Sequence, residues 1–320
     1  MISAPAITTL EFYPNRSPYL RYFALWYFTI LISIWTIAGH TLLGFEQSYA
    51  QPVAGVIAAI LAQVLLEWVD ARATNRATRF SGGWQALVNF LPPAIIPGLA
   101  CAMLLYPNEN VGPVVFAVVA SIASKVIIRA PVGGGRTQHV FNPSNFGITL
   151  TLLLMPNVGL APPYQFTENV VGFGHWAIPG VIVATGIFIH AKFTGRLPLV
   201  FGWLSGFALQ GLTRSVLFGI PWVVPFVPTT SAAFVLFTLY MIPDPATTPL
   251  QPRRQFAYGL AIAALYGVLF VLHIVFGLFI ALFSVSALRG LTLYANSFWR
   301  RWRPTAVASD ALATPAPMAS

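Results

Sequence analysis

Charged side chains are scarce in this chain. They make up 8% of its 320 residues, whereas hydrophobic side chains make up 57%. A water-soluble domain typically has about 25% charged residues, and a chain with so few would lack the surface charge to stay dissolved. The composition therefore excludes a soluble globule and predicts an integral membrane protein.

Cysteine is nearly absent, because Cys101 is the only one and it lies in an apolar run. The chain alone can form neither a disulfide framework nor an iron–sulfur cluster, so an iron–sulfur partner would have to be another protein. Zinc-ligand spacing, a nucleophile elbow, a phosphate-binding glycine loop of the Walker type and paired catalytic acids are also missing. We therefore expect neither hydrolase chemistry nor a metal site.

The net charge of +9 does not indicate nucleic acid, because the seventeen Lys and Arg residues stand singly or in pairs between apolar runs. Membrane loops use charge in this way. A bilayer core requires roughly 20 apolar residues per helix. Ten segments meet or approach that length: 22–43, 52–69, 84–106, 112–129, 143–161, 176–191, 197–218, 229–242, 256–272 and 274–294.

The fifth and eighth segments are short and bounded by proline, which favours tilted, broken or re-entrant helices. The first is expected to be a retained span, since no small-residue cleavage site follows it. Placing the N-terminus in the cytoplasm puts nearly every cation on that side and only Arg214 opposite. The cytoplasmic set is Arg16, Arg21, Arg72, Arg76, Arg79, Lys125, Arg129, Arg136, Lys192, Arg196, Arg253, Arg254, Arg289, Arg300, Arg301 and Arg303.

Ten spans divide into two sets of five, and an odd number per half forces the halves into opposite orientations. PNENVGP at 107–113 is echoed by PDPATTP at 243–249, and HVF at 139–141 by HIVF at 273–276. Chance similarity explains such echoes about equally well. We expect a cytoplasmic segment at 1–21, one transmembrane domain at 22–295 with repeat halves at 22–161 and 176–294, and a disordered tail at 304–320.

A polar motif, HVFNPSNFG at 139–147, begins the fifth span. Asn142 followed by Pro143 predicts a helix start, because asparagine is a good N-cap and proline at the first helical position loses no bonded amide. Nearby glycines 133–135, Arg136 and His139 favour a phosphate or carboxylate site, although an ordinary turn is the alternative. Ser144 and Asn145 lie inside a helix that enters the lipid, where a polar group without a hydrogen-bond partner is costly in free energy.

A second motif, MIPDPATTPLQPRR at 241–254, follows the eighth span. Asp244 is expected to cap a helical turn begun by Pro245, with Thr247 and Thr248 supplying hydroxyl groups. An acid at the membrane edge is a candidate functional residue, and pairing with Arg253 or Arg254 is an equal alternative.

These two motifs resemble the paired motifs of the NqrB and RnfD membrane subunits of ion-translocating, flavin-dependent electron-transport complexes. A closer resemblance, covering nearly the whole chain from GHTLLGFEQS at 39–48 onward, is to the enediyne biosynthesis branch UnbU. The resemblance implies a ten-helix, all-α inverted repeat and a flavin that carries electrons. The threonine motif that holds covalent FMN in the family is missing, because FTEN occupies 166–169, so a covalent flavin is not expected.

We therefore expect a multi-pass protein of the bacterial inner membrane that holds a noncovalent flavin (FMN or riboflavin) or a quinone and exchanges electrons with a soluble or membrane oxidoreductase partner. One alternative is a transporter or channel that uses the same inverted repeat to move a small molecule linked to natural-product biosynthesis, and another is a scaffold that docks biosynthetic enzymes at the membrane. The predicted cofactor-binding residues are Arg136, His139, Asn142, Ser144, Asn145, Asp244, Thr247 and Thr248.

Three other polar groups have mainly structural interpretations. His40, Glu46 and Gln47 end the first span, where a structural pairing is favoured over a proton relay. Glu67 and Asp70 share a helix face near Arg72 and Arg76, which indicates an interfacial ion-pair cluster. The hypothesis that His190 and His273 bind a haem iron is the weakest of these.

Overall fold

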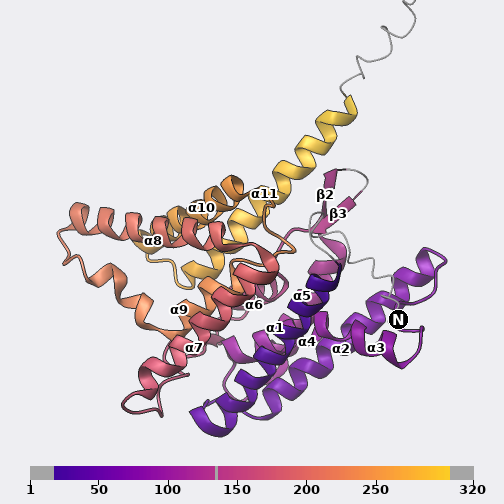
Figure 1. Ribbon diagram of the computed structural model, residues 1–320, viewed down its shortest axis with the longest axis horizontal. Coiled ribbons are helices and arrows are strands. Elements are labelled where there is room, and N and C mark those ends of the chain that lie inside the picture. Colours follow the sequence, from indigo (N-terminus) through magenta and orange to yellow (C-terminus); the bar gives the residue numbers. More distant parts are fainter. Residues whose placement is uncertain (1–17, 134–135, 303–320) are drawn as a thin grey trace, which may run out of the picture.

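A computed structural model describes residues 18–133 and 136–302 of the chain. The predictions for residues 1–17, Gly134, Gly135 and the tail at 304–320 lie outside the described residues. Within the described ranges the protein is mostly helical (Figure 1).

The first half of the chain contains six α-helices. α1 (Pro18–Ala38) continues as a π-helical turn, η2 (Gly39–Leu43), and is followed by α2 (Ala50–Ala73). The expected segment 84–106 is broken into α3 (Trp84–Phe90) and α4 (Pro92–Leu104), because Pro92 and Pro93 interrupt the helical hydrogen bonding. The half ends with α5 (Gly112–Ile127) and α6 (Pro143–Leu154).

The second half begins with α7 (Gly174–Ile189), which continues as the π-helical turn η3 (His190–Thr194), and α8 (Leu197–Phe218). The predicted short, proline-bounded eighth span is a broken element. The 3₁₀ helix η4 (Val224–Thr230) meets α9 (Ala232–Leu236) and its continuation η5 (Phe237–Met241) at a bend of 77°. Two longer helices, α10 (Pro252–Val271) and α11 (Gly277–Trp302), complete the half.

Each of the ten predicted segments contains helix, but not all of these helices are long and apolar enough to be assigned as membrane spans. Six qualify, or seven if the bent pair η4 and α9–η5 counts as one span. α5 and α6 are shorter apolar helices. α8 has 22 residues, but polar residues such as Gln210 and Arg214 reduce its mean hydropathy. The chain is therefore a multi-pass membrane protein.

Two short antiparallel pairs depart from the expected all-α fold. β1 (Leu105–Tyr106) pairs with β4 (Gly159–Leu160), and β2 (Arg129–Gly133) pairs with β3 (Arg136–His139). The second pair forms a hairpin in the region expected to be a loop. It leads directly into α6, and thus places His139 beside the start of that helix.

Helices within each half pack closely, and fewer contacts join the halves. α2 packs against α4 and α5, whereas α8 packs against α10, and Figure 1 shows these groups in separate parts of the molecule. At the α8–α10 contact a Cβ added to Gly259 would lie 2.6 Å from the Trp203 amide nitrogen. Only small residues permit this approach, which is how helices associate in lipid. α11 joins the halves through contacts with α6 and β2.

Candidate functional site

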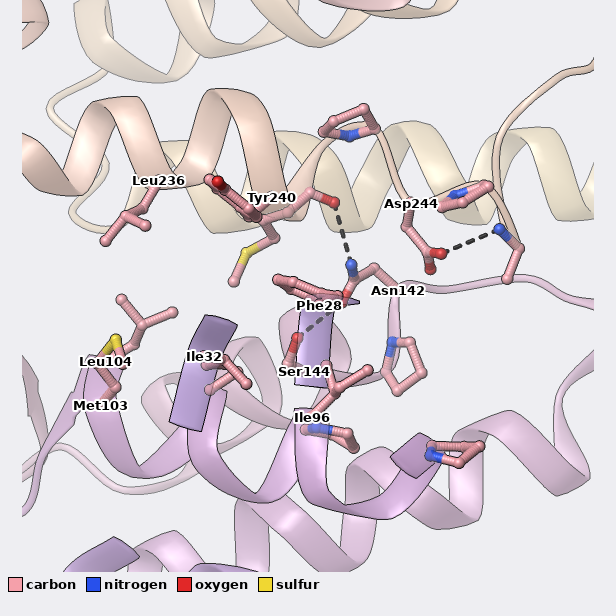
Figure 2. A pocket seen from close by; sticks show the side chains of 18 of the residues that line it. Phe28, Ile32, Ile96, Met103, Leu104, Asn142, Ser144, Leu236, Tyr240 and Asp244 are labelled. Carbon is pink, nitrogen blue, oxygen red and sulfur yellow. Dashed lines mark hydrogen bonds between the residues drawn. The ribbon is translucent and has the colours of Figure 1, made fainter. Parts of the chain in front are cut away.

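The two polar motifs meet at the start of α6. Asn142 is the N-cap of this helix, as predicted, and its Oδ1 accepts hydrogen bonds from Asn145 N at 3.1 Å and Ser144 Oγ at 2.9 Å. The Asn142 Nδ2 atom donates to the carbonyl oxygen of Met241 at 3.0 Å (Figure 2). One buried amide therefore starts a helix in the first half and fastens it to the end of η5.

The 243–249 segment is a tight turn held by side-chain hydrogen bonds. Asp244 Oδ1 accepts from Ala246 N at 3.0 Å, and Asp244 Oδ2 accepts from Thr247 Oγ1 at 3.2 Å. Asp244 therefore caps a single turn that begins at Pro245, because Thr247 N also donates to Asp244 O at 3.3 Å, and the next helix starts at Pro252. Arg253 and Arg254 form no ion pair with Asp244 in the part of the chain that the structure describes.

Arginines from two other elements fix the main chain of this turn. Arg196, which precedes α8, donates to Pro245 O at 3.0 Å, and Arg289 of α11 donates to Thr247 O at 2.8 Å. Arg289 is held in turn by Gln138, whose Oε1 accepts from both terminal nitrogens at 2.9 and 3.0 Å. Both arginines belong to the second half of the chain, and Gln138 links Arg289 to the first half.

A cavity of about 1670 Å³ lies between the two motifs. His139, Asn142, Ser144 and Asp244 line it, and Figure 2 shows the last three facing apolar side chains that include Phe28 and Tyr240. The rings of Phe28 and Tyr240 are stacked, with their centroids 5.5 Å apart and their planes at 16°. The site therefore combines a few hydrogen-bonding groups with a large apolar wall.

The other predicted site residues do not line this cavity. Arg136 is exposed on the hairpin. The Asn145 amide donates to Phe279 O at 3.3 Å, and Thr248 Oγ1 donates to Asp244 O at 2.7 Å. Thr247 is likewise occupied by the Asp244 carboxylate. The two threonine hydroxyls and the Asn145 amide nitrogen thus bond to protein, whereas Asn145 Oδ1 is buried and has no hydrogen-bond partner among the described residues.

Burial controls the charge of the two titratable residues in the motifs. It lowers the pKa of His139 to about 3, with smaller contributions from the positive charges of Lys125 and Arg129. His139 is therefore neutral at pH 7 and offers hydrogen bonds instead of charge to a ligand. Burial raises the pKa of Asp244, an effect opposed by hydrogen bonds from Ala246 and Thr247 and by the charge of Arg196.

The cavity extends to a charged cluster that sequence reasoning did not connect with the motifs. Its lining includes Gln63, Glu67, Asp70, Arg76, Arg79, Lys125 and Arg129. Arg76 pairs with Glu67 at 2.5 Å and also with Asp70, which confirms the predicted ion-pair cluster. Arg79 is a further partner of Glu67 at 3.5 Å, whereas Arg72 lies over the Trp68 ring. The charged cluster and the two motifs are far apart in the sequence, so no sequence pattern indicates that they line the same cavity.

The remaining polar candidates are structural. His40 Nδ1 bonds to Thr36 O at 2.9 Å, whereas Glu46 accepts from Tyr106 at 3.4 Å, so the histidine and the acid do not form a relay. Both ring nitrogens of His190 are occupied, by Thr194 at 2.7 Å and Leu239 O at 2.6 Å. His190 therefore has no nitrogen available for haem iron.

Among the described residues, no group of three or more His, Cys, Asp or Glu side chains is arranged to hold a metal ion. The polar groups that the two motifs present at the cavity are instead an amide, a hydroxyl, a carboxyl and a neutral imidazole, which suit hydrogen bonding to an organic ligand. In comparisons with known proteins, no family model and no curated protein matches the chain.

Proposed function

We propose that this protein is an electron-transfer subunit of the bacterial inner membrane that holds a noncovalent flavin or quinone between its two halves, as in the NqrB and RnfD subunits. The observation that carries the proposal is the cavity at which the Asn142 and Asp244 motifs meet. Ligand sites commonly combine mostly apolar walls with a few placed polar groups, and this cavity has that character.

The apolar wall suits a planar ring. Phe28 from α1 and Tyr240 from η5 present stacked aromatic rings, and both line the cavity. Aromatic ligands gain from offset stacking on such rings in addition to the burial of apolar area. The Ser144 hydroxyl and the Asp244 carboxyl lie on the polar side, where they could bond to carbonyl or ring nitrogen atoms of a flavin or quinone.

A bound flavin or quinone would supply the redox chemistry, and the chain's residues would place and shield it. The raised pKa of Asp244 favours a carboxyl group able to hold a proton beside a ring that takes up electrons. Electrons would pass to or from a soluble or membrane oxidoreductase partner, since the chain has no metal cluster of its own among its described residues.

The proposed fold is a ten-helix inverted repeat with both termini in the cytoplasm. Support comes from equivalent packing in the two halves: α2 contacts α5 as α8 contacts α10, and α5 contacts α6 as α10 contacts α11. The first helix of each half also ends in a π-helical turn closed by a left-handed glycine, Gly44 or Gly195. The sequence echoes at 139–141 and 273–276 directly precede α6 and α11.

Purification in mild detergent tests the proposal. The visible spectrum and the flavin or quinone released by acid and solvent extraction are measured on wild type and on Asp244→Asn. We expect about one bound ring cofactor per chain in the wild type and a changed spectrum in the variant. A folded wild-type protein that contains neither cofactor and binds neither when it is added would overturn the proposal.

A transporter for a small organic molecule is the second candidate, because the cavity lining reaches toward both membrane faces. It includes Lys125 and Arg129 near the predicted cytoplasmic side, and 160–164, Val227 and Thr230 near the opposite side. Uptake by proteoliposomes without a redox donor, unchanged after removal of flavin, would favour transport over electron transfer.

A further inference from the structure

One arginine departs from the charge distribution of the rest of the chain. Arg214 is the only Lys or Arg residue on the predicted outer side, and it lies one turn before the end of α8. It is nevertheless only 6% exposed. A buried cation at the membrane edge is costly unless a partner compensates its charge, so such a residue is a candidate for ligand binding.

The guanidinium group of Arg214 is held in one orientation. Its Nε atom donates to Gln210 Oε1 at 2.9 Å, and the Gln210 amide nitrogen donates to Phe207 O at 3.0 Å. The central carbon of the guanidinium lies over the Phe270 ring, 3.9 Å from the ring centroid. This cation–π contact offsets part of the cost of burying the charge. Gln210 and Phe270 therefore position the group, but neither supplies a negative charge.

The two terminal nitrogens of Arg214 are open to a ligand. Among the described residues Arg214 forms no ion pair, and the bond through Nε is its only hydrogen bond. Neither terminal nitrogen is closed off from the exterior in the part of the chain that the structure describes. Arginine uses such nitrogens for two parallel hydrogen bonds to a phosphate or a carboxylate.

A small apolar pocket of about 250 Å³ adjoins this group. Phe270, whose face the guanidinium covers, forms part of its wall together with Tyr266 and Ile274. Tyr266 interacts electrostatically with Arg214, and its hydroxyl forms no hydrogen bond with another described residue. The pocket borders the central cavity, but Tyr266, Phe270, Ile274 and Gly277 line this pocket alone. Sites for whole organic ligands have volumes of roughly 300–1,000 Å³, so this smaller pocket suits a single apolar chain.

We propose that Arg214 and Tyr266 bind the anionic headgroup of a membrane lipid from the outer leaflet, with one acyl chain in the pocket at Phe270 and Ile274. The guanidinium without a counter-charge specifies an anion, and a phosphate group matches its parallel N–H donors. The apolar pocket specifies a lipid over a soluble anion, because a soluble anion would leave the apolar walls uncovered. Phosphatidylglycerol has this chemistry, since it combines one negatively charged phosphate with two acyl chains.

Photoactivatable lipids test the site on the full-length protein in neutral detergent. One probe is a phosphatidylglycerol with a diazirine in an acyl chain, and the other is the diacylglycerol with the same chains and no phosphate. Cross-linked peptides are identified by mass spectrometry in wild type, Arg214→Gln, Arg214→Lys and Arg72→Gln. Arg72 is the matched control, because it also lies over an aromatic ring and forms no ion pair among the described residues, but it is exposed and lines neither cavity.

At sub-saturating concentration, the phosphatidylglycerol probe should label residues 266–278 on the order of tenfold more strongly than the uncharged probe in wild type and Arg72→Gln. The reason is that only the charged probe gains hydrogen bonds to the guanidinium. Arg214→Gln should abolish the preference. Arg214→Lys, which keeps the charge but lacks the two parallel donors, should restore only part of it. Inorganic phosphate in excess should not compete.

Equal labelling by both probes in the wild type would overturn the site. A preference that Arg214→Gln leaves unchanged would also overturn it, because other cations of the chain would then attract the lipid. Labelling that inorganic phosphate suppresses would refute the lipid as the occupant. Should Arg214→Gln fail to fold, the position of the cross-links in the wild type decides. Preferential labelling of 266–278 supports the site, and labelling confined to the cytoplasmic ends of the helices counts against it.

Discussion

The amide nitrogen of Asn142 and the carbonyl oxygen of Met241, 99 positions apart in the chain, are joined by a hydrogen bond of 3.0 Å. The oxygen of the same amide caps α6. Both polar atoms of the asparagine side chain are thus used: the oxygen caps α6 locally, and the nitrogen forms the long-range contact with Met241. The start of α6 and the end of η5 are consequently held in a fixed relation at the cavity wall.

Replacing Asn142 should therefore lower the free energy of unfolding by more than the loss of an ordinary helix cap does. We expect Asn142→Ala to lower the free energy of unfolding by about 2–3 kcal/mol, because it removes the cap and the bond to Met241 together. Asn142→Asp retains a capping oxygen and should lose only the stabilisation from the hydrogen bond to Met241. Thermal unfolding in detergent measures both.

Ser144→Ala is the control for Asn142, because Ser144 lines the same cavity but contributes only one bond to the Asn142 oxygen. Its effect should be below about 1 kcal/mol. If Asn142→Ala were no more destabilising than Ser144→Ala, the joining function of Asn142 would be refuted.

Glu67 should be the most sensitive carboxylate of the charged cluster. Its side chain is only 5% exposed, and it accepts from Arg76, Arg79 and the Arg79 main-chain nitrogen. Glu67→Gln should destabilise the protein by about 2 kcal/mol, since the buried side chain would no longer neutralise the partly exposed Arg76 and Arg79. Thermal unfolding of the purified variants gives the comparison.

Asp70→Asn provides the matched control, because Asp70 pairs with the same Arg76 but has a side chain that is 45% exposed. Solvent screening should keep its effect below about 1 kcal/mol. Equal losses in the two variants would show that burial does not govern this cluster.

Local sequence patterns predicted the position of the helices well, because a long apolar run leaves few alternatives in a bilayer. The cap at Asn142 was also predictable, since an Asn-Pro pair specifies a helix start through chemistry at adjacent positions. The β2–β3 hairpin was missed. Its strands are short, and the glycines between them are equally typical of a loop, so the local pattern does not specify a hairpin.

The cavity wall could be predicted only in part. The sequence motifs assign Asn142 and Asp244 to one predicted cofactor site, and both line one cavity. Phe28, Tyr240 and Lys125 were not anticipated there. They come from helices whose rotation is set by packing against distant partners, such as the α2–α5 contact, and no local pattern specifies that rotation.

The buried imidazole of His139 should make stability depend on pH. Its pKa in the folded protein is about 3, below the ordinary value of 6.5. Between these values the unfolded chain binds a proton that the folded protein excludes. Its contribution to stability is therefore complete above pH 6.5 and decreases as the pH falls, by about 2 kcal/mol at pH 5.

Unfolding of wild type and His139→Gln at pH 7 and pH 5 isolates this effect, because glutamine does not titrate. The wild type should lose more stability than the variant on acidification. Identical losses would mean that His139 is protonated in the folded protein, and the neutral imidazole assigned to the cavity would be wrong.

Labelling with a membrane-impermeant maleimide can test the proposed orientation. Cys101 is fully buried, so the wild type should remain unlabelled in intact cells and in inverted vesicles. Arg254 and Glu109 are exposed and lie at opposite predicted faces. We expect Arg254→Cys to react only in inverted vesicles and Glu109→Cys only from outside the cell, because each thiol must meet the reagent in water. The same accessibility for both positions would contradict the span count between them, since losing or adding one span exchanges the faces of everything that follows.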